Sequence, residues 1–251
     1  MRRFDTWLRT VALGALLVPA FAAAASVVPA ACTAPSEVTT VTTVTAADVE
    51  ASNRKIGAAY ADLVQTWGSG FADIGARFAR PDIVRYRSAV RTPCGVMRSG
   101  NAGYCVGDNT IYYDDVFVAG QAKAAARQFG TDGDMAAVGV IAHEMGHAVA
   151  MQLGHMWRES YRNEAVADCL AGAFAKSADS RELLEEGDVD EAFYGMASAG
   201  DPTPQLTGDN RVDRAILVRA ARMGHGTDEQ RVGNFRAGLD RGAGVCLAEF
   251  R

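Results

Sequence analysis

Two histidines four residues apart, with a glutamate directly after the first, constrain this chain more than any other feature: His143, Glu144 and His147. In an α-helix, side chains four residues apart lie on one face, so both imidazoles can reach one metal ion at about 2.0–2.1 Å. Glu144 is rotated by about 100° from His143, so it borders the ion as a base for bound water instead of binding it. The pattern predicts a helix that carries a zinc site.

The residues around this motif are apolar at helical spacing: Ala136, Val138, Val140, Ile141, Val149 and Met151. A mostly buried helix is therefore predicted, with Asp134 as its N-terminal cap and Gly154 at its end. The alternative is a pair of buried histidines that only make hydrogen bonds. Because a chain with 4 histidines should match the pattern by chance only about 0.003 times, the metal site is favoured.

A catalytic zinc site needs three protein ligands and one open position. Glu164 and Asp168 are the candidates for the third ligand, because they lie one turn apart on a following helix, predicted from about Arg162 to Ser177. Their neighbours are apolar: Ala165, Val166, Ala167, Leu170 and Phe174. An exposed acidic face is the alternative, but such neighbours indicate burial, and an unpaired buried carboxylate is costly.

The histidine motif followed by Asn163, Glu164 and Asp168 resembles the gluzincin metallopeptidases. The resemblance implies that Glu164 is the third zinc ligand and that Asp168 accepts a hydrogen bond from the free nitrogen of His143. That division agrees with the chemistry, because a metal-bound imidazole needs an acceptor to fix its tautomer. The resemblance also suggests that Asn163 supports His147 in the same way.

Several further segments, in one order from about Pro81 to the C-terminus, make the chain similar to the bacterial neutral zinc metallopeptidases, a family with a membrane-proximal N-terminus. They are Thr92–Gly95, Tyr104–Cys105, Asp108–Tyr113, the histidine motif, Glu164–Gly172, Gly208–Asn210 and His225–Arg231. The resemblance implies one zinc ion, a zincin-like metallopeptidase domain over residues 48–251, and hydrolysis of peptide bonds in a peptide or protein substrate.

His225 precedes a predicted helix start, and the resemblance makes it a donor to the oxyanion of the tetrahedral intermediate. The alternative for His225 is a surface position near a helix cap. The rival function is a non-catalytic exported zinc protein that acts as an envelope scaffold or adaptor, although a scaffold has no use for Glu144. Hydrolysis of a non-peptide amide would share the same metal chemistry.

The fold class predicted from the pattern is α+β and mainly α, with a small β-sheet before the central zinc-binding helices. The predicted strands are Ile83–Tyr86 and Thr110–Tyr113, and the predicted helices besides those of the motifs are Ala46–Trp67, Asp188–Ala199, Asn210–Met223 and Asp228–Arg241. The second strand carries Tyr112 and Tyr113 and could bind a substrate backbone at its edge, although core packing is the simpler interpretation.

The first 31 residues have the layout of an export signal or membrane anchor. A basic head with Arg2, Arg3 and Arg9 precedes an apolar run from Val11 to Val28. A buried first helix is the alternative, but the run has no polar face. Residues 32–47 are rich in Thr and Val and are interpreted as a tether.

The 5 cysteines fit an oxidising compartment. Cys32 follows small residues, as in a bacterial lipobox, and lipid on Cys32 would leave four cysteines for two disulfides. Cys94 and Cys105 flank a turn-rich loop that a disulfide would close. Cys169, next to Asp168, could be an extra zinc ligand, but a disulfide with Cys246 is the better interpretation in an oxidising compartment. A cleaved signal with one free thiol and an uncleaved anchor are the alternatives to the lipoprotein.

The protein is therefore expected outside the cytoplasm, attached to the membrane through its N-terminal segment or secreted. The net charge is −5, and no basic stripe is interleaved with aromatic residues, so no nucleic-acid partner is expected.

Overall fold

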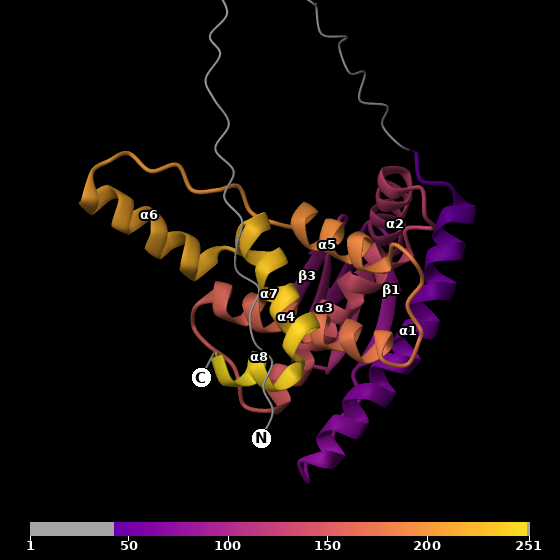
Figure 1. Cartoon of the computed structure of the whole chain (residues 1–251). Coiled ribbons are helices and arrows are strands. Elements are labelled where there is room, and N and C mark those ends of the chain that lie inside the picture. Colours follow the sequence, from indigo (N-terminus) through magenta and orange to yellow (C-terminus); the bar gives the residue numbers. More distant parts are fainter. Residues whose placement is uncertain (1–42, 250–251) are drawn as a thin grey trace, which may run out of the picture. The chain divides into compact units, whose positions relative to one another are not determined.

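A long helix and a small sheet precede the helix that carries the histidine motif (Figure 1). The structure, a computed structural model, describes residues 43–249, so the predicted export segment 1–31 and Cys32 lie outside the described residues. In chain order the elements are α1 (Ala46–Asp73), β1 (Asp82–Tyr86), β2 (Ala89–Thr92), β3 (Gly95–Arg98), β4 (Ala102–Cys105), β5 (Thr110–Asp114), α2 (Asp115–Phe129), α3 (Asp134–Gln152), α4 (Ser160–Asp179), α5 (Asp188–Ser198), α6 (Asn210–Met223), α7 (Asp228–Arg241) and α8 (Ala243–Glu249). The described residues are thus mainly helical with a small sheet, as predicted.

Helix α1 begins at a capping box, in which Thr45 and Asp48 bind each other's backbone N–H groups. The predicted start at Ala46 is confirmed, so Ala46 and Ala47 belong to the helix and not to the tether. The helix ends at Asp73, beyond the predicted end at Trp67. The buried stripe of α1 is Val49, Ser52, Ile56, Leu63, Trp67 and Phe71.

The main sheet has the strand order β1-β5-β4, with β5 parallel to β1 and antiparallel to β4. Every residue of β5 is buried, and both of its edges are paired. The strand with Tyr112 and Tyr113 therefore has no free edge for a substrate, and the edge strands of this sheet are β1 and β4. The two strands expected from the sequence are confirmed, whereas β2, β3 and β4 were not expected. Strands β3 and β4 lie in the turn-rich loop that Cys94 and Cys105 flank, and β2 lies just before it.

Helix α3 lies at the centre of the described residues and packs against α1, α2, α4, α5 and the sheet. Its close approach to α4 depends on Gly146, inside the histidine motif. A Cβ atom at Gly146 would lie 2.7 Å from the carbonyl oxygen of Ala167, which is too close for any other residue. Two glycines allow a similar close approach between α4 and α7. A Cβ atom at Gly172 would lie 1.9 Å from the carbonyl oxygen of Phe235, and a Cβ atom at Gly238 would lie 1.7 Å from the carbonyl oxygen of Cys169.

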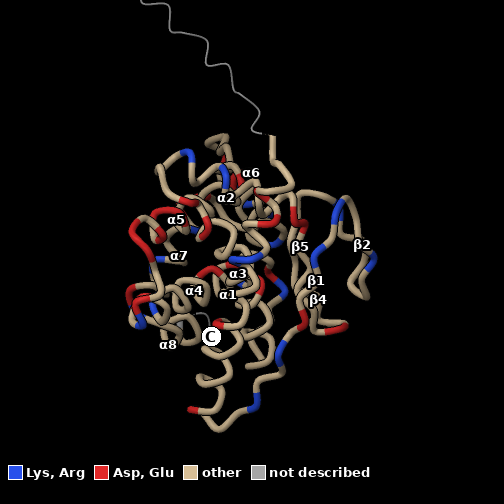
Figure 2. Tube along the Cα trace, turned by 90° about the vertical axis from the view of Figure 1, so that its right-hand side faces the viewer, with Lys and Arg blue, Asp and Glu red and all other residues tan. Residues whose placement is uncertain are grey.

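Acidic residues gather around α5 (Figure 2), and one of them, Glu191, is fully buried and caps the N-terminus of α3. Its two carboxylate oxygens accept hydrogen bonds from the backbone N–H groups of Gly133 at 3.0 Å and Met135 at 2.9 Å. The sequence-based cap at Asp134 is wrong, because Asp134 is the first helical residue and its carboxylate lies 2.7 Å from the ammonium of Lys55. The cap comes from a distant element, which satisfies free N–H groups at a buried helix end.

Both predicted disulfides are formed, Cys94–Cys105 and Cys169–Cys246. The first joins the turn between β2 and β3 to the end of β4, and the second joins α4 to α8, a short helix that the sequence pattern did not indicate. No helix in residues 43–249 is both long and apolar enough to cross a membrane.

Replacing Glu191 by Ala should lower the free energy of unfolding by about 2–4 kcal/mol, because two buried N–H groups at the start of α3 lose their acceptor. Urea denaturation followed by circular dichroism measures this change. Asp190→Ala is the matched control, since Asp190 lies in the same helical turn but is exposed. Equal effects of the two substitutions would contradict the capping by Glu191.

Candidate metal centre

Three potential metal ligands from two helices meet at one point. His143 and His147 lie on α3 and Glu164 lies on α4, and their donor atoms are all within 4.8 Å of one another. The two Nε2 atoms are 3.1 Å apart. The carboxylate oxygens of Glu164 lie 3.2 Å from Nε2 of His143 and 3.5 Å from Nε2 of His147.

These distances fit a tetrahedral zinc ion. Ligand atoms about 2.0–2.1 Å from a zinc ion lie about 3.3–3.4 Å from one another in a tetrahedron. The three observed separations of 3.1, 3.2 and 3.5 Å, of which the last two end on different oxygens of Glu164, lie around that value. Two imidazoles and one carboxylate are also a ligand set used in catalytic zinc sites. The residues present therefore fit zinc, with a fourth position left for solvent or substrate.

The charges at the site favour a cation. Burial disfavours the imidazolium form of His143, but hydrogen bonds to Asp168 and Glu164 outweigh burial and raise the pKa of His143 to about 10. Burial opposes the carboxylate of Glu164 as well, yet its contacts with His143 and His147 hold its pKa well below the usual range. In the protein alone a proton thus resides on the donor atoms, and a metal ion that binds there displaces it.

Asp168 on α4 contacts the ring nitrogen of His143 that does not face Glu164. Its Oδ1 lies 2.8 Å from Nδ1 of His143, and the carboxylate is completely buried. Because a carboxylate only accepts, Nδ1 carries the proton and Nε2 is left to face Glu164 and the metal position. This is the arrangement that the family resemblance implied.

The buried carboxylate of Asp168 has a second partner, Arg231 on α7, to which no role was assigned from the sequence. The guanidinium donates to both oxygens of Asp168, from Nη2 at 2.6 Å and from Nε at 3.2 Å. It also donates from Nη1 to the carbonyl oxygen of Ala199 at 3.1 Å. One signal could have found Arg231: it lies four residues before Phe235, in the stripe of α7 that is buried.

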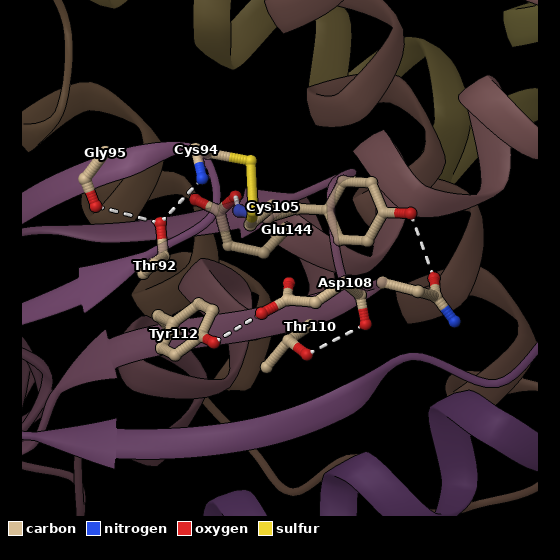
Figure 3. Close-up of a disulfide and its surroundings, with 10 residues drawn as sticks. Thr92, Cys94, Gly95, Cys105, Asp108, Thr110, Tyr112 and Glu144 are labelled. Atoms are coloured by element: carbon tan, nitrogen blue, oxygen red, sulfur yellow. Dashed lines mark hydrogen bonds between the residues drawn. A yellow bond between two sulfur atoms is a disulfide. The ribbon is translucent and has the colours of Figure 1, made fainter.

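Glu144 lies beside the ligands and is only 7 % exposed. Its Oε2 accepts a hydrogen bond of 2.8 Å from the backbone N–H of Tyr104 in the edge strand β4. Figure 3 shows Glu144 together with the Cys94–Cys105 disulfide, whose Cys105 directly follows Tyr104 in the chain. The carboxylate is therefore oriented by the edge of the sheet.

The ligands and Glu144 line one cleft of about 680 Å³. Its walls come from β3, β4, α2, α3, α4, α5 and the segment before α7. Its apolar lining includes Met97, Val106, Phe117, Val140, Met151, Met156 and Met196. The side chain of His147 is 21 % exposed, so the metal position is reachable from the solvent.

His225 also lines this cleft, with 59 % of its side chain exposed. Its Nδ1 lies 3.6 Å from a carboxylate oxygen of Asp201, whose other oxygen accepts from the backbone N–H groups of His225 and Gly226. The structure thus brings His225 to the cleft that contains the ligands, while its role stays a prediction.

The expected support of His147 by Asn163 is wrong. The Asn163 carboxamide accepts from the N–H of Trp157 at 3.0 Å and donates to the carbonyl oxygens of Trp157 and Glu159. These bonds hold the loop before α4 in place, and among the described residues no hydrogen bond joins Asn163 to His147.

Comparison with known proteins agrees with this geometry. The family model described as "Putative neutral zinc metallopeptidase" matches residues 24–159 and 156–248. Uncharacterized protein YpfJ of Escherichia coli K12 is 34 % identical over 193 residues, which cover 70 % of this chain and 64 % of that protein. Uncharacterized protein Rv2575 of Mycobacterium tuberculosis H37Rv is 29 % identical over 188 residues, or 66 % of this chain and 60 % of that protein. The chain spans less than two thirds of the length of these relatives, and no solved structure matches it.

Asp168→Asn should weaken zinc binding by about 10- to 100-fold, because an amide in place of the carboxylate no longer favours the proton on Nδ1 of His143. Competition with a chromogenic chelator at pH 7.5 measures the affinity. Asp179→Asn makes the same chemical change at an exposed position of the same helix and should leave the affinity unchanged. An unaltered affinity in Asp168→Asn would show that Asp168 does not support the ligand.

Proposed function

Because the chain belongs to the family described as "Putative neutral zinc metallopeptidase", we propose that it is an exported zinc-dependent peptidase with a zincin-like fold. The observation that carries this proposal is the cluster of His143, His147 and Glu164 with Glu144 beside it in the same cleft. Three ligands leave one position of a tetrahedral ion open, as catalytic zinc sites require.

His143, His147 and Glu164 would hold the ion. Zinc supplies Lewis acidity there, lowering the pKa of a water molecule to about 7 and polarising a carbonyl group. Glu144 is the group that moves the proton: its carboxylate takes a proton from the attacking water and passes it to the leaving amine. The N–H of Tyr104 keeps this carboxylate in one orientation at 2.8 Å.

The edge strand β4 offers a place for the substrate backbone. The N–H of Tyr104 points away from β5, toward Glu144. Since successive residues of a strand alternate in the direction of their backbone groups, those of Ala102 point the same way. Both residues line the cleft, so an extended peptide can add to β4 by backbone hydrogen bonds.

His225 is the proposed donor to the oxyanion that forms on the scissile carbonyl. Its position in the cleft supports this role, and Asp201 restrains both its ring and its backbone. Export is supported by the two disulfides in residues 43–249, because disulfides persist in oxidising compartments. Attachment to the membrane through residues 1–31 or through lipid on Cys32 stays part of the proposal.

A non-catalytic zinc scaffold is less well supported by these residues. A structural zinc ion is usually closed off by four protein ligands. Among the described residues this site has three candidate ligands. They border a cleft, and the buried carboxylate of Glu144 lies next to them.

Glu144→Gln should reduce kcat for peptide cleavage by at least about 10²- to 10⁴-fold and leave zinc bound, because the amide cannot accept the proton of water. Cleavage of a fluorogenic peptide library by the zinc-loaded full chain, with zinc measured by atomic absorption, tests both parts. Glu186→Gln is the control, since Glu186 is exposed and lies outside the cleft. Undiminished cleavage by Glu144→Gln with zinc retained would remove Glu144 from the mechanism.

A further inference from the structure

The two disulfides differ in their access to solvent. Cys169 and Cys246 are both buried, at 1 % and 0 % exposure, between α4 and α8. Cys94, in contrast, is exposed in the turn between β2 and β3, while its partner Cys105 is completely buried. A reductant from solvent can therefore reach the Cys94–Cys105 bond more easily than the other.

The accessible disulfide lies next to the proposed general base. Cys105 directly follows Tyr104, whose backbone N–H donates to Oε2 of Glu144 at 2.8 Å. The disulfide is thus connected to the carboxylate of Glu144 through the backbone of Tyr104 and a single hydrogen bond. Figure 3 shows the bridge and Glu144 in one view.

The disulfide also fixes a separate piece of structure against β4. Strands β2 and β3 form their own two-stranded sheet, which does not pair with β4. Met97 of β3 packs so closely on Gly103 of β4 that a Cβ atom there would lie 2.5 Å from Cε of Met97. Met97 belongs to a small apolar cluster with Cys105, and it also lines the cleft. The Cys94–Cys105 bond cross-links this hairpin to the end of β4.

We propose that the Cys94–Cys105 disulfide positions Glu144 for catalysis, and that its reduction lowers the rate of peptide hydrolysis without releasing zinc. This inference rests on the proposed function. Without the cross-link, the β2–β3 hairpin and the end of β4 gain freedom, and the N–H of Tyr104 no longer holds the carboxylate of Glu144 in one place. Small misplacements of a reacting group are costly in rate.

The reduction is a two-electron step that breaks the S–S bond and forms two thiols. A dithiol, such as the active site of a thiol–disulfide oxidoreductase, supplies the electrons and protons and becomes a disulfide itself. A trialkylphosphine does the same in the test tube, where it takes an oxygen atom from water and becomes the phosphine oxide while the two hydrogens of water end on the sulfurs.

The first measurement compares kcat, KM and bound zinc of the zinc-loaded full chain before and after treatment with tris(2-carboxyethyl)phosphine. A fall in kcat of about 10- to 100-fold with zinc retained is expected. The double variant Cys94→Ser/Cys105→Ser should have the same low kcat and should not respond to the phosphine. Loss of zinc on reduction, or an unchanged kcat in the double variant, would overturn the inference.

The second measurement does not depend on activity. Hydrogen exchange followed by mass spectrometry or NMR reports the protection of the Tyr104 amide. Its exchange should accelerate in the reduced protein and in the double variant, but not in Cys169→Ser/Cys246→Ser. If the oxidised zinc-loaded protein cleaves no peptide, the proposed function fails, and the Tyr104 amide alone then decides whether the disulfide orients Glu144. Equal protection with and without the disulfide would refute that orientation.

Discussion

The contact between α3 and α4 at Gly146 is the constraint on which the metal centre depends. Two histidines on one helix can face the same point by their spacing alone, but the third ligand must come from another helix. The absence of a side chain at Gly146 lets the backbone of Ala167 approach, which brings Glu164 and Asp168 of α4 to the histidines of α3. Gly172 and Gly238 allow a similarly close approach of α7 to α4, which brings Arg231 of α7 to α4.

The charged side chains around this contact are paired with groups of opposite charge. Glu164 compensates the cation position directly, and Asp168 stands behind His143 with Arg231 as its counterion. A buried carboxylate without such partners would be costly, so the pairing with Arg231 offsets the cost of burying Asp168 at 0 % exposure. Glu144 is held separately, by the edge of the sheet, so its orientation depends on β4 and not on the ligand helices.

The candidate site was predictable to the extent that local spacing and the family resemblance define it. The helical positions of His143, Glu144 and His147 follow from a four-residue repeat, and Glu164 with Asp168 follows from the resemblance. The partners of Glu191 and Arg231 were not predictable, because they lie 56 to 63 residues away in the sequence and only the tertiary packing brings them together. Strand β4 was missed because its four residues, Ala102–Cys105, are short and lack the alternation of a strand. Asn163 was misassigned because the loop before α4 uses its carboxamide locally.

The account rests on one zinc ion bound by His143, His147 and Glu164 with a solvent molecule completing the tetrahedron. X-ray diffraction from the zinc-loaded protein, with data on both sides of the zinc absorption edge, tests this most directly. We expect one anomalous peak about 2.0–2.2 Å from both Nε2 atoms and from a carboxylate oxygen of Glu164. A zinc ion held elsewhere, or one that Glu164 does not contact, would contradict the account.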